Sequence, residues 1–310
     1  MSRGKSLVRF SIAIAVAMGA VLCSYAQQAS LSADQIVSRN VTARGGLQAW
    51  RAVQTLSMSG KMQAGGNNRP ALAPALLKPG AHVGRQPQAP AAKAPQVELP
   101  FQLELKRGHK LRMELQFAGQ TAVQIYDGAN GWKLRPYLNR TDYEPYTADE
   151  AKVAGDQSEL DGYLVDYAAK GTTIETAGTE KVEGRDNYKL KLTLKNGYSF
   201  HVWIDAQTFL ESKMEGTPRR LDGQNRPVEI YLREYRNVNG LQVPYVLETK
   251  VSTVNPGARM PTTSIERITI ENVVVNPKLD DALFVKPQSQ VAANTPHPAT
   301  PSAKPAAQQQ

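Results

Sequence analysis

The sequence predicts a mainly β protein (α+β) whose antiparallel strands, roughly ten to eleven of them, curl into an open or closed barrel. Three observations support this fold class. Apolar and polar residues alternate with a period of two in many segments, most clearly between Pro100 and Phe117. Short turn sequences join successive segments of this kind. Patterns typical of helices occur in only two places, after Ser32 and after Thr147.

The first 26 residues have the pattern of a secretory signal peptide. Arg3, Lys5 and Arg9 precede an apolar run over residues 10–22, and small residues follow up to Ala26. The apolar run is shorter than a transmembrane helix requires. We therefore predict export across a membrane with cleavage after Ala26.

Cys23 is the only cysteine in the chain. It raises the alternative of a lipoprotein anchor, but Leu22 stands before it, where a lipoprotein signal has glycine, alanine or serine. We therefore favour the soluble exported form, in which the mature chain has no disulfide, no thiol nucleophile and no thiolate metal ligand.

The formal net charge of the chain is +9, and about +6 remains once the three basic residues of the signal peptide are removed. A charge of this size suits solubility and weak attraction to anionic surfaces such as lipid headgroups. Lysine and arginine alternate with glutamate and aspartate along the predicted strands instead of clustering on a helix. This pattern argues against nucleic-acid binding.

The folded domain is predicted to occupy residues 27–287. A capping-box pattern from Ser32 to Gln35 begins an amphipathic helix that ends at Gly45-Gly46. A further helical turn is expected directly afterwards, and residues 53–62 are predicted to form the first strand.

Two segments of the chain have a composition that does not favour folding. Residues 65–96 and residues 288–310 are rich in proline, alanine and glutamine and show little periodicity. Such segments cannot bury enough apolar area to offset the entropy of ordering them. We predict that the first is a disordered insertion in a hairpin and that the second is a disordered tail.

The central strands are expected to be Phe101 to Leu105 and Leu111 to Phe117, each with every second side chain apolar. A two-residue Gly108-His109 turn of type II′ would join them and keep both apolar sets on one face. A further strand ends at Tyr126, and the turn from Asp127 to Gly131 leads into the next.

A second capping box, Thr147 to Glu150, is followed by apolar residues at helical spacing from Leu160 to Ala168, before Gly171. This spacing predicts a second helix, although Gly162 within it costs roughly 1 kcal/mol of helix propensity. We expect the helix to cap the sheet. A movable lid over a cavity is the alternative.

The rest of the chain returns to strands. Residues 188–194 and 198–205 form the clearest predicted hairpin, joined at Asn196-Gly197. Further strands are predicted over residues 211–214, 228–235, 243–251 and 264–275.

The sequence shows no catalytic constellation, and we predict that the protein is not an enzyme. It has no nucleophile-elbow serine motif, phosphate loop or dinucleotide fingerprint. Asp280-Asp281 fits a turn or helix cap better than a catalytic carboxylate pair. We expect neither a metal nor a cofactor, because the four histidines lack metal-ligand spacing. They are His82, His109, His201 and His297.

Several short motifs resemble the outer-membrane lipoprotein-sorting family, which has the LolA/LolB-like fold. In the first part of the chain these are Leu105-Lys106-Arg107, Ile125-Tyr126-Asp127-Gly128 with Trp132, the segment ending in Asp166-Tyr167, and Val202 to Asp205. Later ones are Tyr235 to Gly240, Pro244-Tyr245, and Leu279 with Phe284 and Pro287. The resemblance covers most of residues 31–287. The sequence departs from the family at Gly108, where the carrier has proline, and in the proline-rich insertion.

The resemblance implies an incomplete antiparallel β-barrel with helices covering its open face, and a cavity that receives acyl chains in the periplasm. It makes Arg107 a candidate lid latch, because the matching arginine of the carrier hydrogen-bonds to the helical lid and holds the cavity closed. The alternative is a solvated arginine at the end of a strand. The candidate cavity-lining residues are Phe101, Leu103, Leu105, Leu111, Met113, Leu115, Phe117, Leu160, Leu164, Phe200 and Val202.

The leading hypothesis is a periplasmic carrier or binding protein for lipoproteins or other lipids, monomeric and without a cofactor. The alternative is an envelope lipoprotein sensor that uses the same fold to signal to a protein partner. The expected ligand is an acyl chain of a lipoprotein or another lipid, with transient membrane contact and no nucleic acid. The carrier hypothesis implies an inner-membrane release complex or an outer-membrane acceptor as protein partner.

Overall fold

The computed structural model describes residues 31–65, 96–221, 223–253 and 262–287. The chain divides into two units, Met1–Leu31 and Ser32–Gln310, and only Leu31 of the first unit is described. The predicted signal peptide and tail lie outside the described residues, as does the predicted insertion apart from Gly65 and Gln96.

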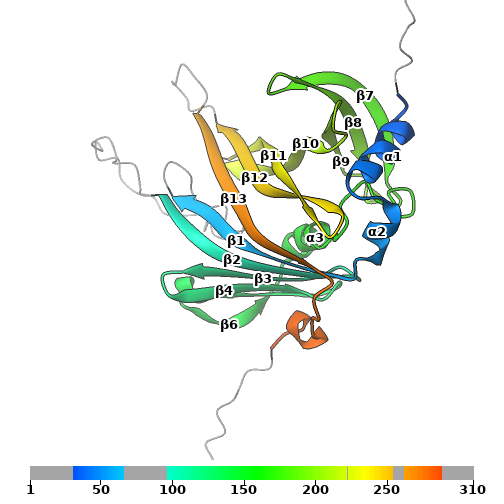
Figure 1. Ribbon diagram of the computed structural model, residues 1–310. Coiled ribbons are helices and arrows are strands. Elements are labelled where there is room, and N and C mark those ends of the chain that lie inside the picture. The colour runs from blue at the N-terminus through cyan, green and yellow to red at the C-terminus, as the bar shows by residue number, and fades with distance from the viewer. Residues whose placement is uncertain (1–30, 66–95, 222, 254–261, 288–310) are drawn as a thin grey trace, which may run out of the picture. The chain divides into compact units, whose positions relative to one another are not determined.

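One antiparallel sheet of 13 strands forms most of the second unit (Figure 1). Its strand order is β6-β5-β4-β3-β2-β1-β13-β12-β11-β10-β9-β8-β7, so the pairing of β1 with β13 joins two meanders. The sheet is open, and β6 and β7 are its edges. The strands are β1 (Thr55–Gly65), β2 (Gln96–Lys106), β3 (Lys110–Phe117), β4 (Gln120–Tyr126), β5 (Gly131–Arg135), β6 (Arg140–Pro145), β7 (Thr173–Val182), β8 (Arg185–Thr193), β9 (Ser199–Asp205), β10 (Glu211–Leu221), β11 (Gln224–Val238), β12 (Leu241–Thr253) and β13 (Thr262–Val275).

The mainly β, antiparallel prediction is confirmed, but the expected number of strands was too low. The two strands that the sequence did not reveal are the edge strands β6 and β7. Nearly every residue of β7 is exposed, and β6 has no buried residue. Neither strand therefore carries the apolar alternation on which the prediction depends.

The first two helices pack at the end of the sheet near β7 and the β11–β12 turn. α1 (Ala33–Ala43) begins with the predicted capping box, in which Ser32 and Gln35 each accept a hydrogen bond from the other's backbone N–H. α2 (Leu47–Ala52) follows the Gly45-Gly46 break. Gly45 has a φ of +117°, and a Cβ there would lie 2.4 Å from the Gly240 carbonyl oxygen, so the close approach requires glycine.

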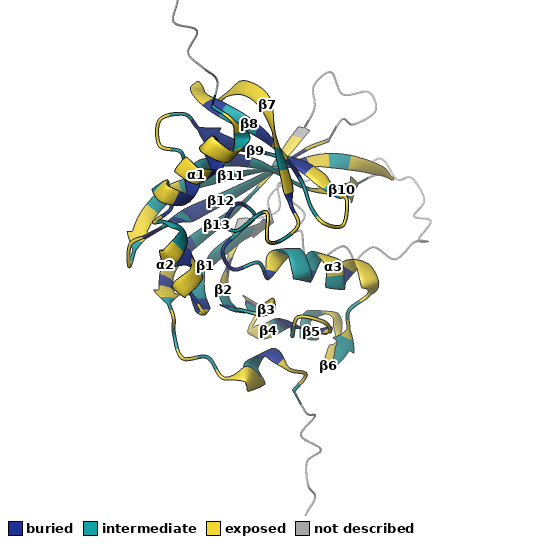
Figure 2. Cartoon of the chain, turned by 90° about the vertical axis from the view of Figure 1, so that its right-hand side faces the viewer, coloured by how far each residue is buried: buried dark blue, intermediate teal, exposed yellow. Residues whose placement is uncertain are grey.

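α3 (Ala148–Gln157) begins at Thr147 with the second predicted capping box. It lies inside the curve of the sheet and contacts β4 and β5 (Figure 2). We call this side of the sheet the inner face. Two short 3₁₀ helices, η2 (Pro136–Leu138) and η3 (Asp281–Phe284), complete the fold. Asp280 is the N-cap of η3, in agreement with the predicted turn or helix cap. None of the helices in the described ranges has the length and apolar character needed to cross a membrane.

The prediction that the second helix continues to Gly171 is wrong. The helix ends at Gln157, and residues 158–171, the 158–171 segment, form a series of turns. Gly162 and Asp166 have φ angles of 77° and 52°, in the left-handed region that a right-handed helix cannot include. The apolar spacing from Leu160 onwards therefore reflects packing against the sheet and not a helical face.

The predicted type II′ turn between β2 and β3 is also wrong. Lys106 pairs with Lys110, so the loop contains three residues, and both Gly108 and His109 have positive φ angles. The expected register is nevertheless correct, because Leu105 faces Leu111 across the pair. The apolar side chains of both strands therefore share the inner face.

Candidate functional site

The inner face of the sheet carries a continuous band of apolar side chains. Cross-strand pairing connects Met113 to Leu103 and Leu103 to Met58. A second row of cross-strand neighbours extends from β2 to β11, and each residue in it pairs with the next: Leu99, Met62, Ile268, Leu247 and Leu232. Residues directly opposite in such ladders lie on one face, so these side chains are neighbours.

Many side chains of this band are only half-buried, although they lie in the middle of the sheet. All four methionines among the described residues belong to this half-buried set. Methionine adapts its shape to irregular apolar partners more readily than branched side chains do. The half-buried residues are Met58, Met62, Leu103, Met113, Met214, Ile230, Leu232, Leu247 and Ile268.

The structure places most of the predicted cavity-lining residues on the inner face or against it. Leu103 and Met113 belong to the half-buried band, whereas Phe117 is 41% exposed at the far end of β3. The others are buried: Phe101, Leu105, Leu111 and Leu115 on β2 and β3, Leu160 and Leu164 in the 158–171 segment, and Phe200 and Val202 on β9.

The 158–171 segment packs its apolar side chains on the β9 end of the inner face. The ring of Tyr163 meets the ring of Phe200 edge-on, with centroids 4.9 Å apart. Leu164 and Val165 are almost completely buried. Burial raises the pKa of the Tyr163 hydroxyl, as expected for a phenol enclosed by apolar groups.

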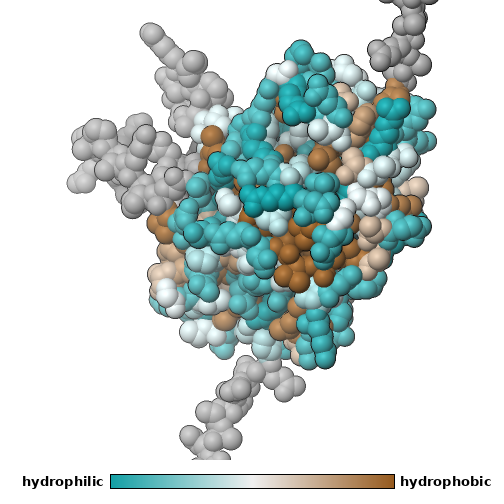
Figure 3. Space-filling model, in the orientation of Figure 1, coloured by the Kyte–Doolittle hydropathy of each residue, from teal (hydrophilic) through white to brown (hydrophobic). Residues whose placement is uncertain are grey.

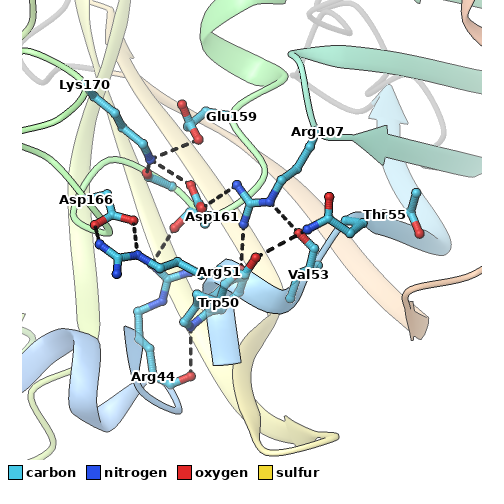
Figure 4. A network of polar contacts seen from close by, with 12 residues as sticks. Arg44, Trp50, Arg51, Val53, Thr55, Arg107, Glu159, Asp161, Asp166 and Lys170 are labelled. Carbon is cyan, nitrogen blue, oxygen red and sulfur yellow. Dashed lines mark hydrogen bonds and ion pairs between the residues drawn. The ribbon is translucent and has the colours of Figure 1, made fainter. Parts of the chain in front are cut away.

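Arg107 connects three parts of the chain at the edge of this segment (Figure 4). Its Nε donates to the Val53 carbonyl oxygen and its Nη2 to the Trp50 carbonyl oxygen, each at 2.6 Å. Its Nη1 lies 3.0 Å from Asp161 Oδ2. The guanidinium therefore ties the end of α2 to the 158–171 segment, and its role as a latch stays a prediction.

A second arginine holds the same segment from inside the protein. Arg44, at the end of α1, is buried and donates from Nη1 to the Asp161 carbonyl oxygen at 3.0 Å. Its guanidinium lies 4.3 Å from the centroid of the Trp50 ring and 3.5 Å from Glu211. The sequence did not point to Arg44, because its polar partners Asp161 and Glu211 are more than a hundred positions away along the chain.

Further ion pairs extend the network along the 158–171 segment. Lys170 Nζ lies 2.7 Å from Asp161 Oδ1 and 3.0 Å from Glu159, and it donates to the Gly162 carbonyl oxygen at 2.6 Å. Arg51 forms a two-bond pair with Asp166 at 2.6 and 2.8 Å. The segment is thus fixed by cations from α1, α2 and the β2–β3 loop.

Two carboxyl groups in this network have pKa values that move in opposite directions. Burial alone would raise the pKa of Asp161, but hydrogen bonds from Glu159, Lys170 and Arg107 lower it to about 2. Burial raises the pKa of Glu159, and its hydrogen bond with Asp161 adds to that effect. Asp161 therefore loses its proton before Glu159 as the pH rises, and it faces both Arg107 and Lys170.

A separate ion pair anchors α3 on the inner face. Lys133 of β5 and Glu150 of α3 are both buried, and their side-chain nitrogen and Oε2 lie 2.6 Å apart. Burial would raise the pKa of Glu150, but the hydrogen bond from Lys133 lowers it. The pair fixes the first turn of α3 over β5.

Apolar residues are also visible from outside. In Figure 3 the largest group of hydrophobic atoms lies near the centre, at the place where Figure 1 shows α3 and the end of the β11–β12 hairpin, and smaller groups lie elsewhere on the same face. Within the described ranges, no group of three or more His, Cys, Asp or Glu side chains is arranged to hold a metal ion. His201 lies 2.9 Å from Glu215, and His109 is in the β2–β3 loop.

Comparison with known proteins gives similarity in structure only. No family model matches the chain, and no curated protein matches it. A LolA superfamily protein from Nitrosomonas europaea has 12% identity and a TM-score of 0.49, covering 83% of this chain and 99% of that chain.

Two further solved structures are similar to the same extent. A DUF1329 family protein from Desulfovibrio piger has 14% identity and a TM-score of 0.49, covering 82% of this chain and 97% of that chain. A putative outer membrane lipoprotein-sorting protein domain from Vibrio parahaemolyticus has 12% identity and a TM-score of 0.48, covering 80% and 94%. Similarities of this size do not identify a ligand or an activity.

Proposed function

We propose that this chain is an exported, periplasmic lipid-binding protein that holds acyl chains of a lipoprotein or another lipid against the inner face of its sheet. The observation that carries the proposal is the half-buried apolar band, in which four methionines lie among leucine and isoleucine side chains. Each methylene group that a ligand buries there contributes about 0.8 kcal/mol. An acyl chain needs no polar partner, catalytic group or cofactor for this kind of binding.

The proposal also specifies which elements of the protein cover the bound acyl chains. α3 packs over β4 and β5, and the 158–171 segment packs over β9. The part of the apolar band on the middle strands lies between these two elements. In this proposal the two elements close over the ligand, and Arg107 keeps the 158–171 segment in place. The carrier role, in which the ligand is passed on to an acceptor, is the form of lipid binding that we favour.

The test is to measure bound lipid directly. Protein purified from a membrane-containing host is expected to release lipid on organic extraction, which mass spectrometry detects, and to bind a fluorescent fatty-acid probe. Met58→Glu puts a charge into the apolar band and is expected to abolish both signals. Ser57→Glu is the matched control, because Ser57 is the adjacent residue, also half-buried, on the opposite face of β1.

Two results would contradict the proposal. The first is a wild-type protein that is consistently free of lipid and does not bind the probe. The second is equal loss of binding in both variants with both still folded, which would show that the inner face is not the binding surface.

A further inference from the structure

The pairing between β2 and β3 does not extend over the first residues of β2 or the last residues of β3. The last pair is Phe101 with Leu115, although β2 begins at Gln96 and β3 continues to Phe117. The next pair in the same register would be Pro100 with Gln116. Proline has no N–H to donate, so it cannot complete that pair, and the strands separate there.

The separation opens a wedge in the sheet, which we define by residues 97–100 of β2 and residues 116–121 around the β3–β4 turn. These residues line a hollow of about 640 Å³. Figure 1 shows the start of β2 diverging from the β3–β4 hairpin. Two of the most exposed large apolar side chains of the described structure, Val97 at 45% and Phe117 at 41%, stand on the two sides of the wedge.

The direction of the main-chain groups follows from the alternation of an antiparallel strand. Arg107 N–H donates to the Gln54 carbonyl oxygen at 2.9 Å, so the odd-numbered residues of β2 direct their main-chain groups towards β1. The even-numbered residues therefore direct theirs towards β3. At Glu98 no described strand lies on that side, and its N–H and C=O point into the wedge.

The charges at the wedge favour a cationic partner. Glu98 is the charged side chain that lines the hollow, and it is more than half exposed. Lys61 lies 3.3 Å from Glu98 and 3.4 Å from Glu271. Because this one lysine pairs with two carboxylates, the three side chains together keep a net negative charge.

We propose that the wedge is a docking site for an extended, basic polypeptide segment of a partner protein, which adds to β2 as a short strand. Glu98 supplies the pair of main-chain hydrogen bonds that such strand addition requires, and Val97 and Phe117 hold an apolar side chain of the peptide. The carboxylates of Glu98 and Glu271 attract a lysine or arginine of the same peptide. The wedge adjoins the proposed lipid-binding band at Leu99, but the main-chain groups of Glu98 that bind the peptide do not belong to the band.

Glu98→Pro is the decisive variant, because it removes the Glu98 N–H, which is directed into the wedge, and leaves the hydrogen bonds to β1 intact. The probe is a fluorescein-labelled peptide of alternating valine and threonine with a lysine at each end, measured by fluorescence anisotropy with the full mature chain. Glu98→Pro is expected to weaken its binding about tenfold, the equivalent of one good hydrogen bond. Glu98→Gln keeps the N–H and is expected to weaken binding by only about twofold at low salt.

A second pair of variants tests the apolar contact. Phe117→Ser is expected to weaken peptide binding about tenfold, and Val274→Ser, at a residue of similar exposure on β13, is expected to leave it unchanged. The proposal is overturned if the wild-type protein does not bind the peptide, or if Glu98→Pro binds it as well as the wild type does. Self-association that Glu98→Pro abolishes would also overturn it, since a second copy of the chain would then be the partner. Lipid content measured on the Glu98→Pro and Glu98→Gln variants is expected to stay constant, so the two proposals fail separately.

Discussion

Replacing Asp161 with asparagine tests how strongly the polar network holds the 158–171 segment. Asp161→Asn keeps the size of the side chain but removes the charge that faces Arg107 at 3.0 Å and Lys170 at 2.7 Å. The pKa of Asp161 is lowered from its ordinary value of 3.8 to about 2. At 1.36 kcal/mol for each pKa unit, this corresponds to about 2.4 kcal/mol of folding free energy. Solvent screens the two partly exposed cations, so we expect about 1–2 kcal/mol.

The sign of the pH dependence follows from the direction of the shift. A carboxyl group whose pKa is lowered in the folded state contributes stability above its unfolded pKa, and that contribution disappears as the pH falls from about 4 towards 2. Glu159 acts in the opposite direction, because its raised pKa favours the folded state as the pH falls. Carrying out the comparison in a Glu159→Gln background removes this opposing contribution.

The assay is urea unfolding followed by tryptophan fluorescence, at pH 7 and at pH 3, with hydrogen exchange of the amides in the 158–171 segment. Asp161→Asn is expected to lower the free energy of unfolding at pH 7, to lower it less at pH 3, and to speed exchange in the segment. Asp186→Asn is the control, because Asp186 is a largely exposed aspartate paired with Lys181 and is expected to contribute less than about 0.5 kcal/mol. A difference between Asp161→Asn and the wild type that does not change with pH would refute the electrostatic explanation.

Three other substitutions have clear expected outcomes. Arg107→Leu is expected to change the rate of lipid release with the sheet still folded, since the closed and open populations shift; unchanged release and unchanged hydrogen exchange would contradict the latch role. Gly60→Ala is expected to lower the free energy of unfolding by at least about 2 kcal/mol in urea titrations, because the new Cβ would lie 2.0 Å from the Thr269 carbonyl oxygen. Lys133→Met is expected to destabilise the fold by about 3–5 kcal/mol because it leaves the Glu150 charge buried and unpaired. Adding Glu150→Gln to Lys133→Met is expected to recover part of that loss, and simple additivity in this cycle would contradict the buried-pair interpretation.

Local patterns in the sequence were sufficient to predict most of the elements. Both capping boxes form as expected, since the residues involved lie within four positions of one another. The alternation in β2 and β3 correctly placed both apolar sets on one face. Signals of this kind depend only on neighbours along the chain, and the sequence displays them directly.

The parts that the sequence did not reveal depend on contacts between distant residues. The half-buried band needs the pairing of β1 with β13, which brings Met62 next to Ile268. Arg44 meets Asp161 across 117 positions of sequence, and no local pattern signals that contact. The helix predicted to reach Gly171 failed for a similar reason. Tertiary packing of its apolar residues outweighed their helical spacing, and Gly162 and Asp166 took up left-handed backbone conformations.

The half-buried band connects the stability of the fold with its proposed function. Truncating a fully buried residue such as Ile125 removes many packing contacts and leaves a cavity, which typically costs about 2–5 kcal/mol. A half-buried side chain such as Met113 has fewer partners in the unliganded protein, so its truncation is expected to cost less stability. If a ligand completes the packing around Met113, the same truncation also removes contacts between the protein and the ligand. The affinity for the ligand then falls. Residues of the band should therefore affect lipid binding more than unfolding, and residues of the core should do the reverse.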